Sequence, residues 1–499
     1  MTAPPFAEWG AFARRNASLA EEWPAALRDL RLAAREESVS LARGFTRAIG
    51  APVPAGGAGS LIVMTGHQPE IYHPGVWVKA LLVQRLSEEI SALGMDVVVD
   101  TDVPARVELL TPRLAPQVTV GRALLAEGAG AAYAQMPVPD AERRAAFRHD
   151  GLEALATLPA PSLRRHFARF CDCLEAAVGS AHNLGELLVA ARRRYEAPAL
   201  TDYLEIPVSA QSKTKAFARF AGLLLTDPER FREVSNAALA RYRQRTGTRS
   251  LAQPFPDLGG AGERVEVPFW LLRDGARVPL HVDARRALLD GERVVAELGQ
   301  DADSATAALL EARVALVPRA MTLTMFERVF VSDLFVHGTG GGRYDRVTDE
   351  VVREFLGIEP PAFVVASMTL LLPLGCRITT EADVADLEQR VHRLEHNPDQ
   401  VLGEVEFDTV LERERAEALA ARKAELVAAI SRPEADRKML GAAIREVNEE
   451  LTVILADLVT EVRAELARLR SARDESAVLT DRTYPYCLWD PCEVMDKVR

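Results

Sequence analysis

Two short segments hold the residues best suited to chemistry, and the first surrounds a histidine. In the sequence Thr-Gly-His-Gln-Pro, Gly66 permits a sharp turn that presents His67 and Gln68. An imidazole can hold a phosphate or act as a general acid or base near pH 7, and Lys79 in the expected next helix can reach the same anion. The alternative is that His67 only caps or braces its turn.

The second segment is a run of three glycines, Gly340, Gly341 and Gly342, between an expected strand and an expected helix. Three glycines permit positive φ and close backbone approach, so the run predicts a nest of amides suited to phosphate or carboxylate. It is neither a G-x-G-x-x-G fingerprint nor a P-loop, because no Gly-Lys-Ser/Thr follows. We count His337, just before the run, with the ligand-binding candidates. The alternative is a tight turn alone.

Charged residues flank these two turns. Arg319 and Arg343 are candidates to clamp a carboxylate or phosphate with two hydrogen bonds. Asp345 is a candidate to bind a ribose hydroxyl or an amine. Asp100 and Asp102 follow an expected strand and could hold an amine or a metal, although acids at strand ends are as often loop caps.

The cysteines predict no metal site. Cys171 and Cys173 lie two positions apart on an expected helix, where their side chains point in different directions. Cys487 and Cys492 lack a second close pair. With Cys376, the total of five is small and odd, which fits reduced thiols in a cytoplasm.

The histidine turn belongs to a strand–helix–strand pattern. Residues 61–64 form a short apolar run, which predicts a buried strand. Apolar positions then recur at helical spacing from 76 to 93, and Gly94 is placed to end that helix. Residues 97–99 open a second strand. Because all of this fits within about 42 residues, it predicts a right-handed βαβ unit and a parallel sheet.

The glycine run belongs to a second, similar pattern. We expect a strand at 330–336, a helix at 344–356 and another strand at 362–366. Two such units with glycines at their turns predict one doubly wound α/β domain built from distant segments. Ligands bind such sheets beyond the carboxyl ends of the strands, so we expect both turns to line one pocket.

Other segments complete the expected organisation. Residues 105–260 are mostly helical in composition and predict an insertion around the sheet, and 265–272 with 278–282 predict a β-hairpin. The expected parts are these: an N-terminal helical segment (1–58), the core (59–378), a helical hairpin (379–475) and a tail that packs on the core (476–499).

The expected hairpin rests on heptad spacing. Apolar residues follow a mostly seven-residue repeat from 440 to 469, and a weaker helix at 405–430 ends before a break at Pro433. This predicts an antiparallel coiled-coil hairpin. The alternative is two ordinary surface helices.

Composition limits the class of protein. The 499 residues are 48% hydrophobic and 26% charged, with a net charge of −12, typical of a globular protein. An acidic balance argues against general nucleic-acid or anionic-membrane binding. The sequence shows neither a secretory signal nor a spanning segment, so we expect a cytoplasmic protein with a small-molecule substrate.

Taken in order, four segments and the late helical hairpin resemble a known family. They are Thr65-Gly-His-Gln-Pro69, Val97-Val-Val-Asp-Thr-Asp102, Pro318-Arg319 and Phe335-Val-His-Gly-Thr-Gly-Gly-Gly342. Together they resemble the cysteine-adding enzyme family of bacillithiol biosynthesis. The resemblance implies a Rossmann-like core with helical insertions, and a projecting coiled coil that helps the chain to form a homodimer.

The resemblance also implies site residues. The family's glycine turns match this chain at Gly66, Gln68, Gly340 and Gly341, which carry over as ligand-binding positions. Three positions depart from the family pattern: His67 stands in place of a glutamine, and Gly342 and Arg343 stand where a proline and an acidic residue are expected.

The implied reaction joins the carboxyl group of cysteine to the amine of a glucosaminyl-malate. A free carboxylate needs a better leaving group, so ATP is an expected co-substrate. Arg319 and the glycine run would hold phosphates or a malate-like carboxylate, and His67 or Asp102 would deprotonate the amine. The alternatives are a nucleotidyl- or glycosyl-type transferase on another polar metabolite, and a non-catalytic coiled-coil scaffold.

Overall fold

A computed structural model describes residues 2–114, 117–199, 202–250, 255–375, 378–430, 432 and 434–498, without the side chain of Ala261. Two compact units are present. Unit 1 comprises Met1–Arg113, Val120–Leu371 and Arg482–Arg499, and unit 2 comprises Leu114–Thr119 and Leu372–Asp481. The expected helix break at Pro433 and the thiol of Cys376 lie outside the described residues. Within those residues, no helix is both long and apolar enough to span a bilayer.

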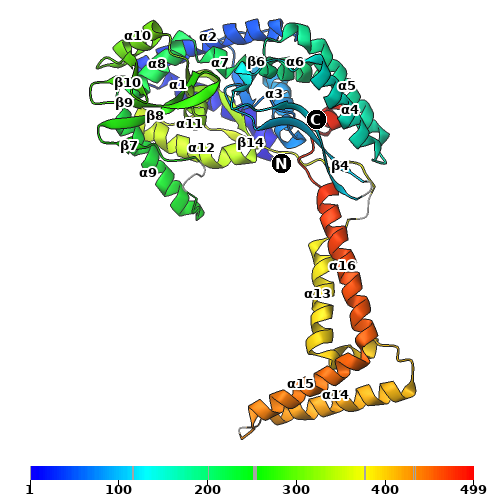
Figure 1. Cartoon of the computed structure of the whole chain (residues 1–499). Helices are drawn as coiled ribbons and strands as arrows, with labels where there is room; N and C mark the ends of the chain where they lie inside the picture. Colours follow the sequence, from blue (N-terminus) through cyan, green and yellow to red (C-terminus); the bar gives the residue numbers. More distant parts are fainter. Residues whose placement is uncertain are drawn as a thin grey trace. The chain divides into compact units, whose positions relative to one another are not determined.

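Unit 1 is an α/β structure built on a six-stranded sheet, as predicted (Figure 1). The strand order is β1-β14-β13-β2-β3-β6, in which only β1 runs antiparallel to its neighbour. The bounds are β1 (Thr2–Ala3), β2 (Ile62–His67), β3 (Leu93–Val98), β6 (Tyr203–Pro207), β13 (Leu334–His337) and β14 (Val364–Ala366). Strands from distant parts of the chain therefore share one carboxyl-terminal edge.

Both faces of this sheet are buried, which explains why its strands are continuous apolar runs. Val63 of β2 faces helices α1 (Trp9–Glu21) and α3 (Pro74–Ile90), where it packs near Trp9. Ile62 and Met64 face the other side, in the core that includes Leu30 of α2 (Ala25–Ala48).

The end of α3 differs from the prediction. The helix ends at Ser91, whose φ of 54° is left-handed, and Gly94 lies inside β3. A Cβ at Gly94 would lie 3.0 Å from Ser87 Oγ and 3.2 Å from Tyr203 Cβ. Gly94 therefore lets α3 and β6 pack closely on β3 instead of stopping the helix.

The expected helical insertion at 105–260 also contains strands, so that prediction was incomplete. β4 (Arg106–Arg113) and β5 (Thr119–Glu127) pair with each other, and β6 joins the main sheet. The helices are α4 (Ala141–Ala156), α5 (Pro161–Ala177), α6 (Leu184–Glu196), α7 (Val208–Gln211), α8 (Lys215–Leu225) and α9 (Pro228–Thr246). β4 has eight residues whose burial mostly alternates, so a strand signal was present in this region although its overall composition is helical.

A second, antiparallel sheet contains the predicted hairpin. Its strand order is β11-β10-β9-β8-β12. The bounds are β8 (Arg264–Arg273), β9 (Ala276–Val282), β10 (Ala287–Asp290), β11 (Arg293–Glu297) and β12 (Leu316–Pro318), and helix α10 (Ala302–Ala312) precedes β12. The hairpin expected at 265–272 and 278–282 is confirmed by the pairing of β8 with β9.

The strand expected at 330–336 is mostly wrong. Helix α11 (Ala320–Met325) continues into a π-helical turn, η4 (Phe326–Val331), and β13 begins only at Leu334. Every residue of η4 is buried. A segment buried on all sides has no polar face, so its apolar run resembled a strand.

The three glycines do not form a loop. Helix α12 (Thr339–Val351) begins after Gly338, so Gly340, Gly341 and Gly342 lie in its first turn, and none of them has positive φ. A Cβ at Gly342 would overlap Cγ2 of Val365, whereas one at Gly340 would meet nothing within 4 Å. The predicted amide nest is therefore wrong: Gly342 lets α12 approach β14.

Unit 2 is helical, with α13 (Glu381–His396), α14 (Val410–Ile430), α15 (Arg437–Ile454) and α16 (Ala456–Leu479) (Figure 1). The single helix expected over 440–469 is interrupted at Leu455. α15 packs on α14 around Leu419 and Val447, and α16 packs on α13 around Leu394 and Val462. The apolar residues of 440–469 therefore pack in two separate helix pairs instead of forming one continuous coiled-coil interface.

Two glycines of α12 give a matched test of this packing. We expect Gly342→Ala to lower the free energy of unfolding by about 1–3 kcal/mol, because the methyl group must displace Val365. Gly340→Ala, the control, should leave stability unchanged or raise it by up to about 1 kcal/mol, because alanine favours helix and the space is free. Urea unfolding of both variants measures these changes. Equal changes in the free energy of unfolding would contradict the close contact between Gly342 and Val365.

Candidate functional site

A cavity of about 510 Å³ lies at the carboxyl-terminal edge of the main sheet, within unit 1. We call it the strand-end cavity. Its lining includes residues at the ends of β2, β3, β13 and β14 and residues of β9, β12 and α11. Its polar lining residues are His67, Gln68, His73, Lys79, Thr101, Asp102, Arg277, Arg319, Thr324, Glu327, His337, Thr339, Tyr344, Ser367 and Arg482.

The cavity brings together most of the predicted site residues, including both turns. Those that line it are Gly66, His67, Gln68, Lys79, Asp102, Arg319, His337, Gly340 and Gly341. Gly66 is required here by close packing, because a Cβ would lie 3.0 Å from Cβ of Val97. Gly342, Arg343 and Asp345 are not among its lining residues.

Asp345 has an internal role, so the prediction that it contacts a ligand is wrong. It is fully buried, accepts a 2.7 Å hydrogen bond from Thr324 Oγ1, and pairs with Arg328 and with His337 Nε2 at 2.8 Å. Burial alone would raise the pKa of Asp345, but the charges of Arg328 and His337 lower it. His337 thus reaches the cavity while its ring is held in place. Arg343 is exposed on the outer side of α12.

His67 and Lys79 lie at the base of the histidine turn. Burial and the nearby charge of Lys79 lower the pKa of His67 to about 3, so its imidazole is neutral at pH 7. Lys79 Nζ donates a 2.7 Å hydrogen bond to the Gly66 carbonyl. Burial lowers the pKa of Lys79 to about 8. Proton transfer at neutral pH favours a group whose pKa is near 7, and Lys79 fits this better than His67.

Asp102 holds neighbours in place. Its Oδ2 accepts a 2.8 Å hydrogen bond from Gln68 Nε2, and its Oδ1 lies 2.7 Å from Arg277 Nη1. Both carboxylate oxygens are thus engaged, and the pair links the histidine turn to β9. This arrangement suits a residue that positions Gln68 and Arg277.

Arg319 provides a further cation in the lining of the cavity. Its Nη2 lies 2.6 Å from Glu266 Oε1, and its guanidinium carbon lies 3.7 Å from the centroid of the Trp270 ring. Its Nε is buried with no hydrogen-bond partner in the part of the chain that the structure describes. Stacking fixes the plane of the guanidinium, which favours binding of a planar carboxylate or a phosphate.

Sequence reasoning missed Glu327. This residue of η4 lines the cavity and is fully buried. Neither carboxyl oxygen has a partner with full hydrogen-bond geometry among the described residues, and the side chain of Gln211 is its nearby hydrogen-bonding group. Burial raises the pKa of Glu327 to about 8, and the side chain of Gln211 opposes this shift. The available signal was a lone Glu-Arg pair within the apolar run Met-Phe-Glu-Arg-Val-Phe-Val. A π-helical turn is also frequent at functional sites.

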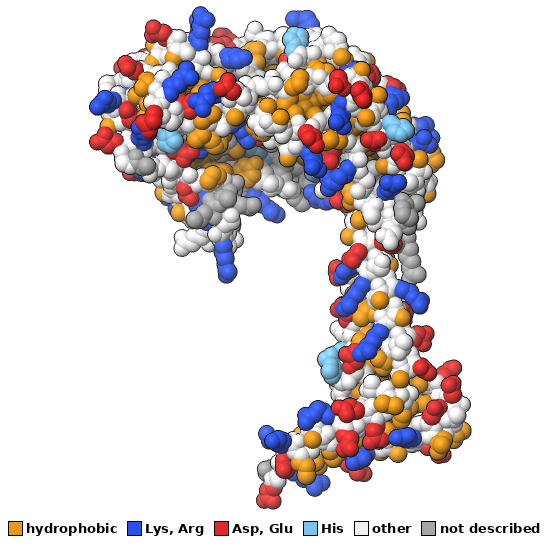
Figure 2. All heavy atoms as spheres, in the orientation of Figure 1, with side chains coloured by type: hydrophobic (Ala, Val, Ile, Leu, Met, Phe, Trp, Pro, Cys, Tyr) orange, Lys and Arg blue, Asp and Glu red, His pale blue; other side chains and the backbone are white. Residues whose placement is uncertain are grey.

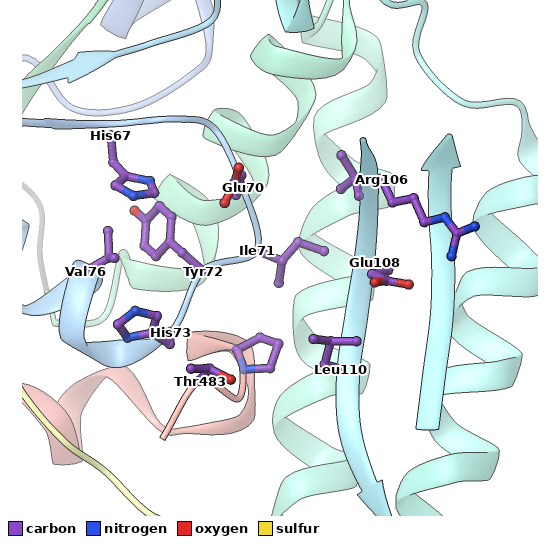
Figure 3. A pocket seen from close by; sticks show the side chains of 12 residues that line it. His67, Glu70, Ile71, Tyr72, His73, Val76, Arg106, Glu108, Leu110 and Thr483 are labelled. Carbon is purple, nitrogen blue, oxygen red and sulfur yellow. The ribbon is translucent and has the colours of Figure 1, made fainter. Parts of the chain in front are cut away.

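A second cavity of about 300 Å³ shares His67, His73 and Val76 with the first. Figure 3 shows His67, Tyr72, His73 and Val76 on one side of it, and Arg106, Glu108 and Leu110 of β4 on the other. The residues 67–76 therefore separate two hollows. Within the described residues, no group of three or more His, Cys, Asp or Glu side chains has a metal-binding arrangement.

The unusual carboxyl of Glu327 makes stability depend on pH. The pKa of Glu327 is higher in the folded protein than its ordinary value of 4.5, so its contribution to stability falls as the pH rises from about 4.5 to about 8. Glu327→Gln cannot ionise. We expect its free energy of unfolding, relative to wild type, to rise by about 2–4 kcal/mol between pH 5 and pH 8.5.

Urea unfolding at several pH values measures this difference, and the exposed Glu263→Gln is the control. A pH-independent difference for Glu327→Gln would contradict the burial of an unpaired carboxyl.

Comparison with known proteins assigns no family to the chain. No protein-family model matches it, and no curated protein is significantly similar.

Proposed function

We propose that unit 1 is a carbon–nitrogen ligase of the cysteine-adding type, which joins an amino-acid carboxyl group to the amine of an acidic amino-sugar acceptor. One observation carries this proposal: the strand-end cavity combines anion-binding groups with two groups whose pKa lies near 8. A reaction between a carboxyl group and an amine needs both functions in one place.

The anion-binding part is formed by Arg319 and by the first turn of α12. Gly340 leaves open space at that turn, and the free N–H groups of a helix N-terminus favour a negative charge. Arg319 and these N–H groups would hold the malate-like carboxylate or the phosphates of ATP. When bound, ATP would supply the leaving group that a free carboxylate lacks.

The proton-transfer part is formed by Glu327 and Lys79. In the bond-forming step, the amine nitrogen attacks the activated acyl carbon, the C–N bond forms, and the bond to the leaving group breaks. The ammonium proton passes to ionised Glu327 or to neutral Lys79. With each pKa at about 8, both forms of either group are populated near neutral pH. Neutral His67 would accept a hydrogen bond from the amine.

An assay with cysteine, glucosaminyl-malate and ATP, followed by mass spectrometry, tests the reaction. We expect a condensation product from wild type and a value of kcat/KM about 10–100-fold lower for Arg319→Ala, because a charged anchor is lost. Arg343→Ala, an exposed cation outside the cavity, is the control and should retain full activity. No product from wild type, or equal losses in both variants, would contradict the proposal.

We further propose that unit 2 joins two copies of the chain. Apolar side chains of α14 and α15 are exposed: Val410 and Leu411 by 75%, Met439 by 62% and Val453 by 76%. Figure 2 shows apolar side chains among the charged ones on this part of the chain. Large apolar side chains exposed on one helix pair favour a protein–protein interface.

Sedimentation equilibrium tests this pairing. We expect wild type to have twice the chain mass of 54.6 kDa, and Val453→Glu to shift the protein to a single chain because it places a charge in the apolar contact. Glu449→Gln on the same helix is the control. A monomeric wild type would contradict the proposal.

A further inference from the structure

A smaller, apolar cavity adjoins the strand-end cavity within unit 1. It has a volume of about 210 Å³ and shares Arg277, Arg319 and Ala320 with its larger neighbour. We call it the Trp270 cavity. Its apolar walls come from α9, residues 255–258, β8 and α11, and they include Leu239, Phe255, Leu258, Trp270 and Met321.

The two cavities meet at aromatic and cationic side chains. Phe255 of the Trp270 cavity and Tyr344 of the strand-end cavity make an edge-to-face ring contact, with centroids 6.3 Å apart. The guanidinium carbon of Arg319 lies 3.7 Å from the centroid of the Trp270 ring, and Arg319 lines both cavities. A ligand that spans the junction would therefore meet a cation at its middle and aromatic walls at one end.

Two buried polar atoms at this site have no partner among the described residues. They are Ser235 Oγ, whose residue is only 1% exposed, and Arg319 Nε. An unpaired buried polar atom is costly unless a ligand or water satisfies it. The Trp270 cavity thus has the composition of a small-molecule site, with mainly apolar walls and a few polar groups that set orientation.

We propose that the Trp270 cavity binds the heterocyclic base of a nucleoside diphosphate or triphosphate, whose phosphates lie in the strand-end cavity. The cavity has a volume of 210 Å³, which is below the range of about 300–1,000 Å³ for sites that hold a whole drug-sized ligand. It would therefore hold one ring system, and the phosphates of the nucleotide would remain outside it. Ser235 Oγ would pair with a polar edge of the base. This inference deepens the proposed function and rests on it for the use of a nucleotide.

Titration calorimetry of the full-length chain with ADP and, separately, with pyrophosphate tests the placement of the base. Leu239→Trp fills the cavity and should weaken ADP binding by more than 10-fold. Ser235→Ala should weaken ADP binding about 5-fold, the equivalent of one hydrogen bond. Neither variant should change pyrophosphate binding, because pyrophosphate has no ring.

Ser235→Ala is a second variant that we expect to fold normally. Removal of an unpaired buried hydroxyl should leave the free energy of unfolding unchanged or higher, so this variant stays informative if Leu239→Trp does not fold. Unchanged ADP affinity in Ser235→Ala and in folded Leu239→Trp would overturn the inference, and the proposed ligase would stand. The inference would also be overturned if wild type bound ADP no more tightly than pyrophosphate, because the adenosine portion would then add no affinity. Failure of wild type to bind either probe would overturn the phosphate site as well.

Discussion

The carboxylate of Asp345 is the interaction on which the architecture of the strand-end cavity depends. Its partners are Thr324 on α11, Arg328 on η4 and His337 at the end of β13. Arg328 also pairs with Asp349 at 2.7 Å, one turn further along α12. Because these groups are buried, removing one partner would leave an uncompensated charge. The network therefore fixes the first turn of α12 relative to the main sheet.

Strand order and close packing at two glycines explain how the turn after β2 and the turn after β13 come together. β13 lies between β14 and β2, so the segment after β13 lies next to the turn after β2. Gly342 then brings α12 onto β14, and Gly66 brings the end of β2 onto Val97. The glycines act through close packing within regular elements, and the space that remains between those elements is the cavity.

Much of this arrangement was accessible from the sequence. The parallel pairing of the strands that contain Met64 and Val97 was predicted because both segments are apolar runs bounded by turns. The contribution of His67 and Arg319 to one cavity followed from the rule that ligands bind at strand ends.

The errors have different causes. One is that burial on all sides removes the periodic signal. The strand predicted at 330–336 included residues 330 and 331 for this reason, although they belong to the buried π-helical turn η4, which also contains Glu327. Asp345 was assigned to a ligand because its partner Arg328 lies 17 positions away and their contact depends on the tertiary fold. The predicted repeat continued through Ile454 and Leu458, whereas Leu455 and Val459 are the buried residues next to the break between α15 and α16.

We propose above all that the strand-end cavity binds an anion between Arg319 and the first turn of α12. Crystals of the full-length chain soaked in tungstate, measured at the tungsten absorption edge, test this binding most directly. We expect a strong anomalous peak between the Arg319 guanidinium and the backbone N–H groups of residues 339–341. Peaks confined to the outer surface, with none in this cavity, would contradict it.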